Sequence, residues 1–189
     1  MNNFIVVMGM HRSGTSLVTG LINSAGYKIN NNMGKDNYNA IGYYEDIDIM
    51  VKNDRLLSHY GGKWDSPPDV IPDKMYEFDY NYDAVKDPRF CLTYPAWLFP
   101  CPYKIVKVKR NKSDCVKSLI KRNGFSVELA SALYDIYNKR LDGWNDVPFI
   151  TINYEDILDN NVKVLEDFIF GKVDISIIDK TLNHGDNNE

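Results

Sequence analysis

The sequence predicts a three-layer α/β domain, in which a central parallel sheet is flanked by helices. The chain opens with a strand, a tight loop and a helical pattern, and short strand-like runs recur from Ala84-Val85 and at residues 103–109 and 148–153. Its 189 residues suffice for one sheet covered on both faces. We expect a single domain over residues 1–182 and a disordered tail over residues 183–189.

Composition and charge exclude several function classes. The chain carries 22 Lys and Arg against 26 Asp and Glu, so it is not a generally basic protein that coats nucleic acid or acidic lipid. Its three cysteines lack the spacing of a zinc site or a disulfide framework, which fits a reducing, cytoplasmic setting. The apolar run at residues 4–8 is too short to span a membrane and lacks the flanks of a signal peptide, so no membrane anchor is expected.

The first strand leads into the loop Gly9–Ser16, which precedes an amphipathic helix. The apolar positions of that helix repeat at the 3.6-residue period and stop at Gly26; they are Leu17, Val18, Leu21, Ile22 and Ala25. A loop placed between a strand and a helix directs free backbone N–H groups and the positive end of the helix dipole at one point. The sequence therefore predicts an anion site and a P-loop-type fold.

The spacing of Gly9 and Gly14 matches the phosphate-binding loop of nucleotide triphosphatases, with one difference. Thr15 and Ser16 follow, where those enzymes place Lys and then Ser or Thr. That Lys neutralises the β- and γ-phosphates beside Mg²⁺, so its absence argues against ordinary ATP chemistry. The nearest cation here is Arg12, which lies on the loop itself.

The run Arg12-Ser13-Gly14-Thr15-Ser16 resembles the loop of sulfotransferases that use 3′-phosphoadenosine 5′-phosphosulfate (PAPS), and the resemblance covers nearly the whole chain. It implies that residues 12–16 hold the 5′-phosphosulfate of PAPS as co-substrate. It also implies metal-independent transfer of a sulfuryl group to an acceptor, most simply a hydroxyl of a small molecule or glycan.

The next segments supply a candidate general base. The Asn-rich stretch Asn30–Asn39 favours turns and is either a connector or a flap over the acceptor. Glu45 follows Gly42-Tyr43-Tyr44 at the start of a helix with Ile47, Met50, Val51 and Leu57 on one face. The resemblance makes Glu45 the base, whereas the helix dipole alone would explain a capping carboxylate there. Asp46 and His59 are the alternative bases, and residues 60–72 form a structured loop.

Ala84-Val85 introduces the run Lys86–Phe90, and together they read as a short buried strand that ends in a charged turn; in open α/β sheets such ends line the ligand crevice. Lys86, Pro88 and Phe90 resemble a Lys-x-Pro-x-aromatic run of glycan sulfotransferases. By that resemblance Lys86 stabilises the charge that develops on the leaving phosphate. Asp87 and Arg89 are expected to pair with each other or with a neighbouring element.

A second anion pocket is predicted between a later strand and its helix. Residues 103–109 alternate as a strand, with Ile105 on one face and Val106 and Val108 on the other, and a helix begins near Ser113. Arg110 and Ser118 stand eight positions apart. PAPS sulfotransferases have an Arg and a Ser at this separation on the 3′-phosphate, a role that suits the planar Arg fork.

The last third of the chain adds two helices, a strand and one further candidate. A helix begins at Ser126, with Leu129, Leu133, Ile136, Tyr137 and Leu141 as its apolar positions, and the last helix carries Val162, Leu165, Phe168 and Ile169. By resemblance Tyr154 lies near the nucleotide; packing against the sheet is the other reading. The C-terminal Arg-Lys-Gly element of cytosolic sulfotransferases is absent.

We therefore expect a PAPS-dependent sulfotransferase. A catalytically idle PAPS-binding module and a P-loop nucleotide kinase are the alternatives. The acceptor class, which includes sugar, lipid, small phenol and peptide tyrosine, stays open, as does the oligomeric state, because acceptor specificity resides in loops.

Overall fold

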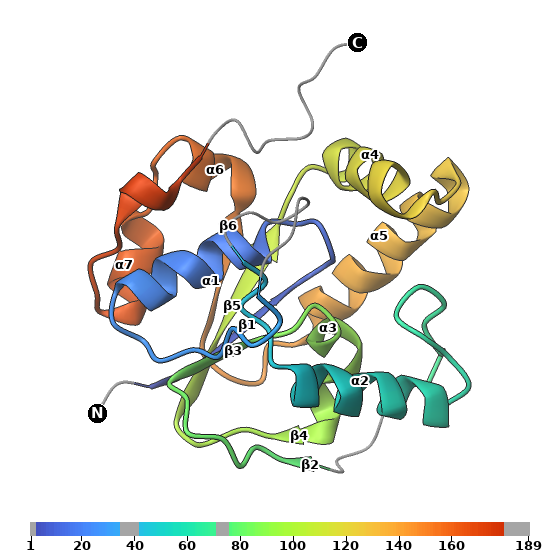
Figure 1. Cartoon of the computed structure of the whole chain (residues 1–189), viewed down its shortest axis with the longest axis horizontal. Helices are drawn as coiled ribbons and strands as arrows, with labels where there is room; N and C mark the ends of the chain where they lie inside the picture. Colours follow the sequence, from blue (N-terminus) through green and yellow to red (C-terminus); the bar gives the residue numbers. More distant parts are fainter. Residues whose placement is uncertain (1–2, 35–41, 71–75, 180–189) are drawn as a thin grey trace.

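A computed structural model describes residues 3–34, 42–70 and 76–179. Its centre is a four-stranded sheet in which all neighbouring strands run parallel (Figure 1). The strands follow the order β3-β1-β5-β6, with bounds Ala84–Lys86, Phe4–Gly9, Tyr103–Lys109 and Phe149–Asn153. This confirms the central parallel sheet expected from the sequence.

Helices cover both faces of the sheet, which makes three layers (Figure 1). One face carries α1 (Thr15–Ser24), α6 (Tyr154–Leu158) and α7 (Lys163–Ile169). The other carries α2 (Ile47–His59), α3 (Phe90–Thr93), α4 (Lys112–Asn123) and α5 (Val127–Gly143). Because the strands are parallel, the loops at their carboxyl ends meet at one edge, where the candidate residues lie.

Strand alternation distributes the apolar side chains between the two cores. In β1, Val6 and Met8 pack on the face covered by α2 to α5, whereas Ile5 and Val7 pack on the opposite face. The alternation predicted for residues 103–109 is confirmed in β5 by Ile105, Val106 and Val108, which divide between the faces as expected.

The face of α2 that packs inward differs from the prediction. The buried residues are Ile49, Asn53, Leu56 and Leu57, whereas Ile47 is 42% exposed. The physical reason is a buried polar contact: Asn53 Oδ1 accepts hydrogen bonds from Thr93 Oγ1 at 2.7 Å and Trp97 Nε1 at 2.9 Å. These bonds fix the rotation of the helix, and an apolar pattern does not reveal them.

The inward face predicted for α5 is correct only in part. Leu133, Tyr137 and Leu141 are buried, whereas Leu129 is 40% and Ile136 37% exposed. Both exposed side chains are apolar, so periodicity alone assigned them to the core. The predicted start of the helix is confirmed, because Ser126 is the N-cap and its Oγ accepts from Leu129 N at 3.2 Å.

The remaining elements lie outside the main sheet. β2 (Tyr76–Glu77) pairs in parallel with β4 (Trp97–Leu98), and two 3₁₀ turns are η1 (Tyr94–Ala96) and η2 (Ile175–Ile177). Within the described ranges no helix combines the length and apolarity needed to cross a bilayer. The predicted tail at residues 183–189 lies outside the described residues.

Candidate functional site

The loop Gly9–Ser16 connects β1 to α1 at the carboxyl edge of the sheet. Arg12 and Gly14 have positive φ angles of 71° and 92°, and Gly14 is the N-cap of α1 with no side-chain cap. The first-turn amides of α1 therefore keep their donors for another acceptor. The Ser13 Oγ is also buried and has no hydrogen-bond partner among the described residues. The loop thus has the geometry of an anion site.

Tyr154 packs directly on Gly14. A Cβ at position 14 would lie 2.1 Å from Cδ2 of the Tyr154 ring, so only glycine fits this contact. The guanidinium carbon of Arg110 lies 4.7 Å from the centroid of the same ring. Tyr154 therefore packs between the loop and Arg110.

Arg12 connects the loop to α4. Its Nε donates a 2.8 Å hydrogen bond to Ser118 Oγ, and its carbonyl oxygen accepts from Arg110 Nη1 at 3.3 Å. Ser118 is 3% and Arg110 7% exposed. The structure thus brings Arg110 and Ser118 to the loop, where both contact Arg12.

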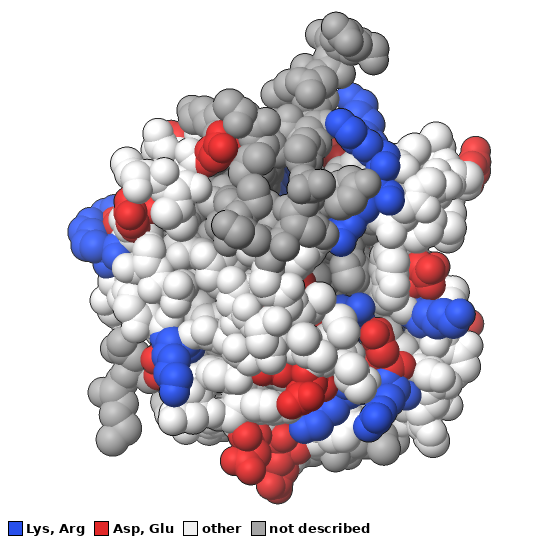
Figure 2. Space-filling view, in the orientation of Figure 1, with Lys and Arg blue, Asp and Glu red and all other residues white. Residues whose placement is uncertain are grey.

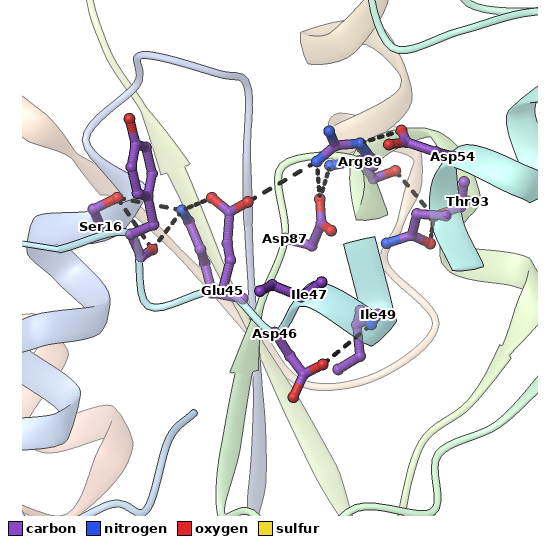
Figure 3. A network of polar contacts seen from close by, with 12 residues as sticks. Ser16, Glu45, Asp46, Ile47, Ile49, Asp54, Asp87, Arg89 and Thr93 are labelled. Carbon is purple, nitrogen blue, oxygen red and sulfur yellow. Dashed lines mark hydrogen bonds and ion pairs between the residues drawn. The ribbon is translucent and has the colours of Figure 1, made fainter. Parts of the chain in front are cut away.

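Lys86, at the end of β3, lies in the site as a buried cation. Its Nζ contacts Ser16 Oγ at 3.2 Å, the Tyr43 carbonyl at 2.9 Å and Glu45 Oε1. Figure 3 shows Glu45 between the Ser16 side of this network and Arg89. The three contacts join Lys86 to two segments distant in sequence, one at Ser16 and one at residues 43–45, so the fold assembles the network at the loop.

Arg89 continues this network away from the loop. Its Nη1 lies 3.9 Å from Glu45 Oε2 and 3.3 Å from Asp87 Oδ1, and its Nε lies 2.6 Å from Asp54 Oδ1 (Figure 3). The expected pairing of Asp87 with Arg89 is therefore confirmed. Burial raises the pKa of Glu45, and the nearby Lys86 opposes that rise. A carboxyl group with a raised pKa is suited to accept a proton from an acceptor.

The two alternative bases occupy different positions. Asp46 is the N-cap of α2, and its Oδ1 accepts from Asp48 N at 2.8 Å and Ile49 N at 3.2 Å. The capping role considered for Glu45 thus belongs to its neighbour. His59 is exposed at the end of α2, with its ring against Tyr60, and does not line the cavity described next.

A cavity of about 330 Å³ opens beside the loop. Its walls include Arg12 and Glu45 from the predicted set, together with His11, Met33, Tyr43, Met50, Trp64, Arg89, Leu119, Arg122 and Asn123. Arg110 and Ser118 lie behind Arg12 and do not line this cavity. Arg110 instead lines a second opening of about 420 Å³ with Tyr134 and Glu155.

Among the wall residues that the sequence did not predict as site residues are His11, Trp64 and Arg122. His11 lies within the loop motif, Trp64 in the loop that precedes Pro67, and Arg122 one turn beyond Ser118 on α4. Arg122 Nη2 donates to Tyr43 Oη at 2.7 Å. The four-residue spacing from Ser118 places Arg122 on the same helix face, which is the signal that could have identified it.

Basic side chains gather around α4, which carries Lys112, Lys117, Lys121 and Arg122 (Figure 2). Elsewhere on the face shown, acidic side chains gather at the lower edge, and the basic side chains lie near acidic ones. Positive charge is therefore local, as the net charge of the chain requires.

Parts of two predicted loops fall outside the described residues, namely 35–39 of Asn30–Asn39 and 71–72 of residues 60–72. The described end of the first is anchored: Asn31 Oδ1 accepts from Tyr44 N at 2.8 Å, and the Gly34 carbonyl accepts from Tyr43 N at 2.8 Å. Met33 and Tyr43 therefore reach the cavity wall together.

Comparison with protein-family models, curated proteins and solved structures gives no significant match. Among the described residues, no group of three or more His, Cys, Asp or Glu side chains is placed to hold a metal ion.

Proposed function

We propose that the protein transfers a sulfuryl group from PAPS to an acceptor hydroxyl. The observation that carries the proposal is the cavity beside the loop, which joins the loop, Glu45 and α4 in one space. The resemblance of residues 12–16 to a sulfotransferase loop supports the same assignment. The cavity is of a size that suits a small ligand rather than an extended surface.

The donor's phosphosulfate would sit on the first-turn amides of α1. These donors and the positive helix end act on a dianionic group without rearrangement, because the loop already holds them in place. Arg12 lies at the cavity wall beside them, and Ser16 Oγ lies within 3.2 Å of Lys86 Nζ. A phosphosulfate at this point would therefore meet a neutral donor and two cations.

The 3′-phosphate would bind near the Arg12–Ser118 hydrogen bond, with Arg110 behind it. Arg offers a planar fork to phosphate, and the Ser hydroxyl adds a neutral donor. The Tyr154 ring, which packs on Gly14 of the loop, lies 4.7 Å from the guanidinium carbon of Arg110. This second anion contact would distinguish PAPS from adenosine phosphates that lack a 3′-phosphate.

Lys86 and Glu45 would exchange partners during the reaction. When the donor is bound, Lys86 Nζ turns from Glu45 to the oxygen between sulfur and phosphorus, which frees Glu45 Oε1 for the acceptor. The acceptor oxygen then forms the new S–O bond while the bond from sulfur to the phosphate oxygen breaks. The proton passes to Glu45, and Lys86 stabilises the charge on the departing phosphate.

Two measurements test the proposal. Isothermal titration should show that 3′-phosphoadenosine 5′-phosphate (PAP) binds and that ATP with Mg²⁺ binds far more weakly. Radiolabelled PAPS should then lose its sulfuryl group to water or to members of a hydroxyl acceptor panel. In Glu45→Gln, turnover should fall by about 10²-fold or more, as for a lost general base, while PAP affinity stays near normal.

Other results would favour one of the alternative functions or a different general base. ATP binding that depends on Mg²⁺ and exceeds PAP binding would favour a nucleotide kinase. Tight PAP binding with neither hydrolysis nor transfer would favour an idle binding module. Full turnover in Glu45→Gln would show that the proton leaves by another route.

A further inference from the structure

His11 lines the cavity and carries a buried ring nitrogen. The ring packs against Trp64 at 4.5 Å and Tyr137 at 5.9 Å between centroids, which fixes its orientation. Its Nε2 atom is buried and makes no hydrogen bond within the described chain. A buried polar atom without a partner costs on the order of 1–3 kcal/mol, so such atoms in folded proteins usually meet a ligand or water.

The charged groups around His11 come from several segments of the chain. Burial, followed by the charges of nearby cations, holds its pKa well below the usual 6.5; these cations are Arg89, Lys86, Arg122 and Arg12. The acidic groups nearby are already engaged, because Glu45 contacts Lys86 while Asp87 and Asp54 pair with Arg89. The imidazole is therefore neutral at physiological pH in the free protein.

We propose that His11 takes up a proton when a multiply charged anion binds the loop Gly9–Ser16, and that its Nε2–H then donates a hydrogen bond to that anion. The proposal rests on the proposed function only for the presence of an anion at the loop. It does not require sulfuryl transfer. The ligand class is a phosphate, pyrophosphate or phosphosulfate group that carries at least two negative charges.

The physical reason is that a bound anion changes the electrostatic potential at the His11 ring. A multiply charged anion beside Arg12 and Lys86 offsets the cations that keep the ring neutral, and in a cavity of low dielectric this change is large. The proton then gains the anion as a partner. Binding and protonation become linked, so affinity should strengthen by up to tenfold for each unit that pH falls between the bound-state and free-state pKa of His11.

The direct test follows the ring itself. The chain has three histidines, and the variant His59→Asn with His184→Asn leaves His11 as the only one. His59 does not line the cavity, and His184 lies outside the described residues. The labelled imidazole is titrated by NMR alone, with pyrophosphate, with PAP and with adenosine as the uncharged control. We expect the pKa of His11 to rise by more than one unit with either anion and to stay unchanged with adenosine.

A second test compares affinities. The phosphates of PAP titrate near pH 6 themselves, so the informative quantity is the ratio of PAP affinity between the wild type and His11→Gln at each pH. This ratio should grow several-fold from pH 8 to pH 6. A constant ratio, or a His11 ring that stays neutral when an anion is bound, would overturn the proposal.

The outcomes separate this inference from the proposed function. PAP binding without a change at His11 overturns the inference and leaves the function standing. Pyrophosphate binding that protonates His11, with no binding of PAP, supports the inference and overturns the function. Absence of binding by both anions in calorimetry overturns both.

Discussion

Arg12 Nε donates a hydrogen bond of 2.8 Å to Ser118 Oγ across 106 positions of sequence. The bond joins the loop after β1 to the helix after β5, two neighbouring strands of the sheet. Since Arg110 contacts the carbonyl of the same Arg12, one loop residue lies at the centre of both predicted anion contacts. The phosphosulfate and 3′-phosphate sites would therefore share Arg12, and a change in one contact should affect the other.

Arg110→Ala should weaken PAP far more than adenosine 5′-phosphate. The loss of a charged hydrogen bond to the 3′-phosphate costs about 1.5–3 kcal/mol, a fall in PAP affinity of roughly tenfold to more than a hundredfold. Isothermal titration with the two nucleotides measures the difference. Lys112→Ala is the control, since Lys112 is a basic residue on α4 that pairs with Asp135 at the surface. Equal losses for both nucleotides would remove the 3′-phosphate assignment from Arg110.

The substitution Gly14→Ala should lower the free energy of unfolding for two separate reasons. A residue with a Cβ is strained by about 1–2 kcal/mol near this positive φ, and the new Cβ would also overlap the Tyr154 ring. The overlap should add roughly 1–3 kcal/mol, as overpacking does elsewhere. Denaturant unfolding measures the total.

Gly26→Ala is the matched control for that prediction. Gly26 has a φ of 95°, close to the 92° of Gly14, yet a Cβ there would meet nothing within 4 Å. Gly26→Ala should therefore lose only the stability that the strained backbone costs. If both variants lose the same stability, Tyr154 moves aside at no cost, and the close contact with Gly14 does not hold the loop in place.

The sequence predicts those site residues whose position follows from the direction of the parallel strands. Parallel strands end at one edge, so Lys86 and Arg110, which follow two strand ends, were expected beside the loop, and both lie there. His11 and Trp64 come together only through tertiary packing: Tyr137 Oη on α5 donates to the Trp64 carbonyl at 2.8 Å. A local pattern does not contain that contact, so the cavity wall could not be predicted.

Lys107→Met should raise stability at neutral pH and remove a pH dependence. Lys107 is 2% exposed, its Nζ lies 3.9 Å from the centroid of the Phe149 ring, and burial lowers its pKa from the usual 10.5. The unfolded chain therefore binds the proton more tightly, so the stability of the wild type rises with pH between the lowered pKa and 10.5. The variant lacks the titrating group and should lack this rise.

Thermal unfolding of the wild type and of Lys107→Met between pH 7 and pH 10.5 measures how the stability difference between the two proteins changes with pH. Lys109→Met is the control, because Lys109 lies on the same strand, pairs with Asp142 at 2.6 Å and is more exposed. That control should keep the rise with pH. A Lys107→Met protein that is less stable than the wild type at pH 7 would show that the contact with Phe149 outweighs the cost of burying the charge.

Asp46→Asn should leave turnover unchanged, in contrast to Glu45→Gln. The two carboxylates are adjacent in sequence, but Oδ1 of Asp46 caps α2, whereas Glu45 lines the cavity and its Oε1 contacts the buried Lys86. Asn caps a helix about as well as Asp, so Asp46→Asn removes the charge and keeps the cap. Asp46→Ala removes the cap, worth about 0.5–2 kcal/mol, and also the acceptor of hydrogen bonds from Tyr82 Oη and Asn30 Nδ2, so it should cost more stability than the cap alone, with turnover still near normal. Denaturant unfolding and the sulfuryl-transfer assay, run on all three variants, separate the two roles. A large loss of turnover in Asp46→Asn with normal stability would move the base from Glu45 to Asp46.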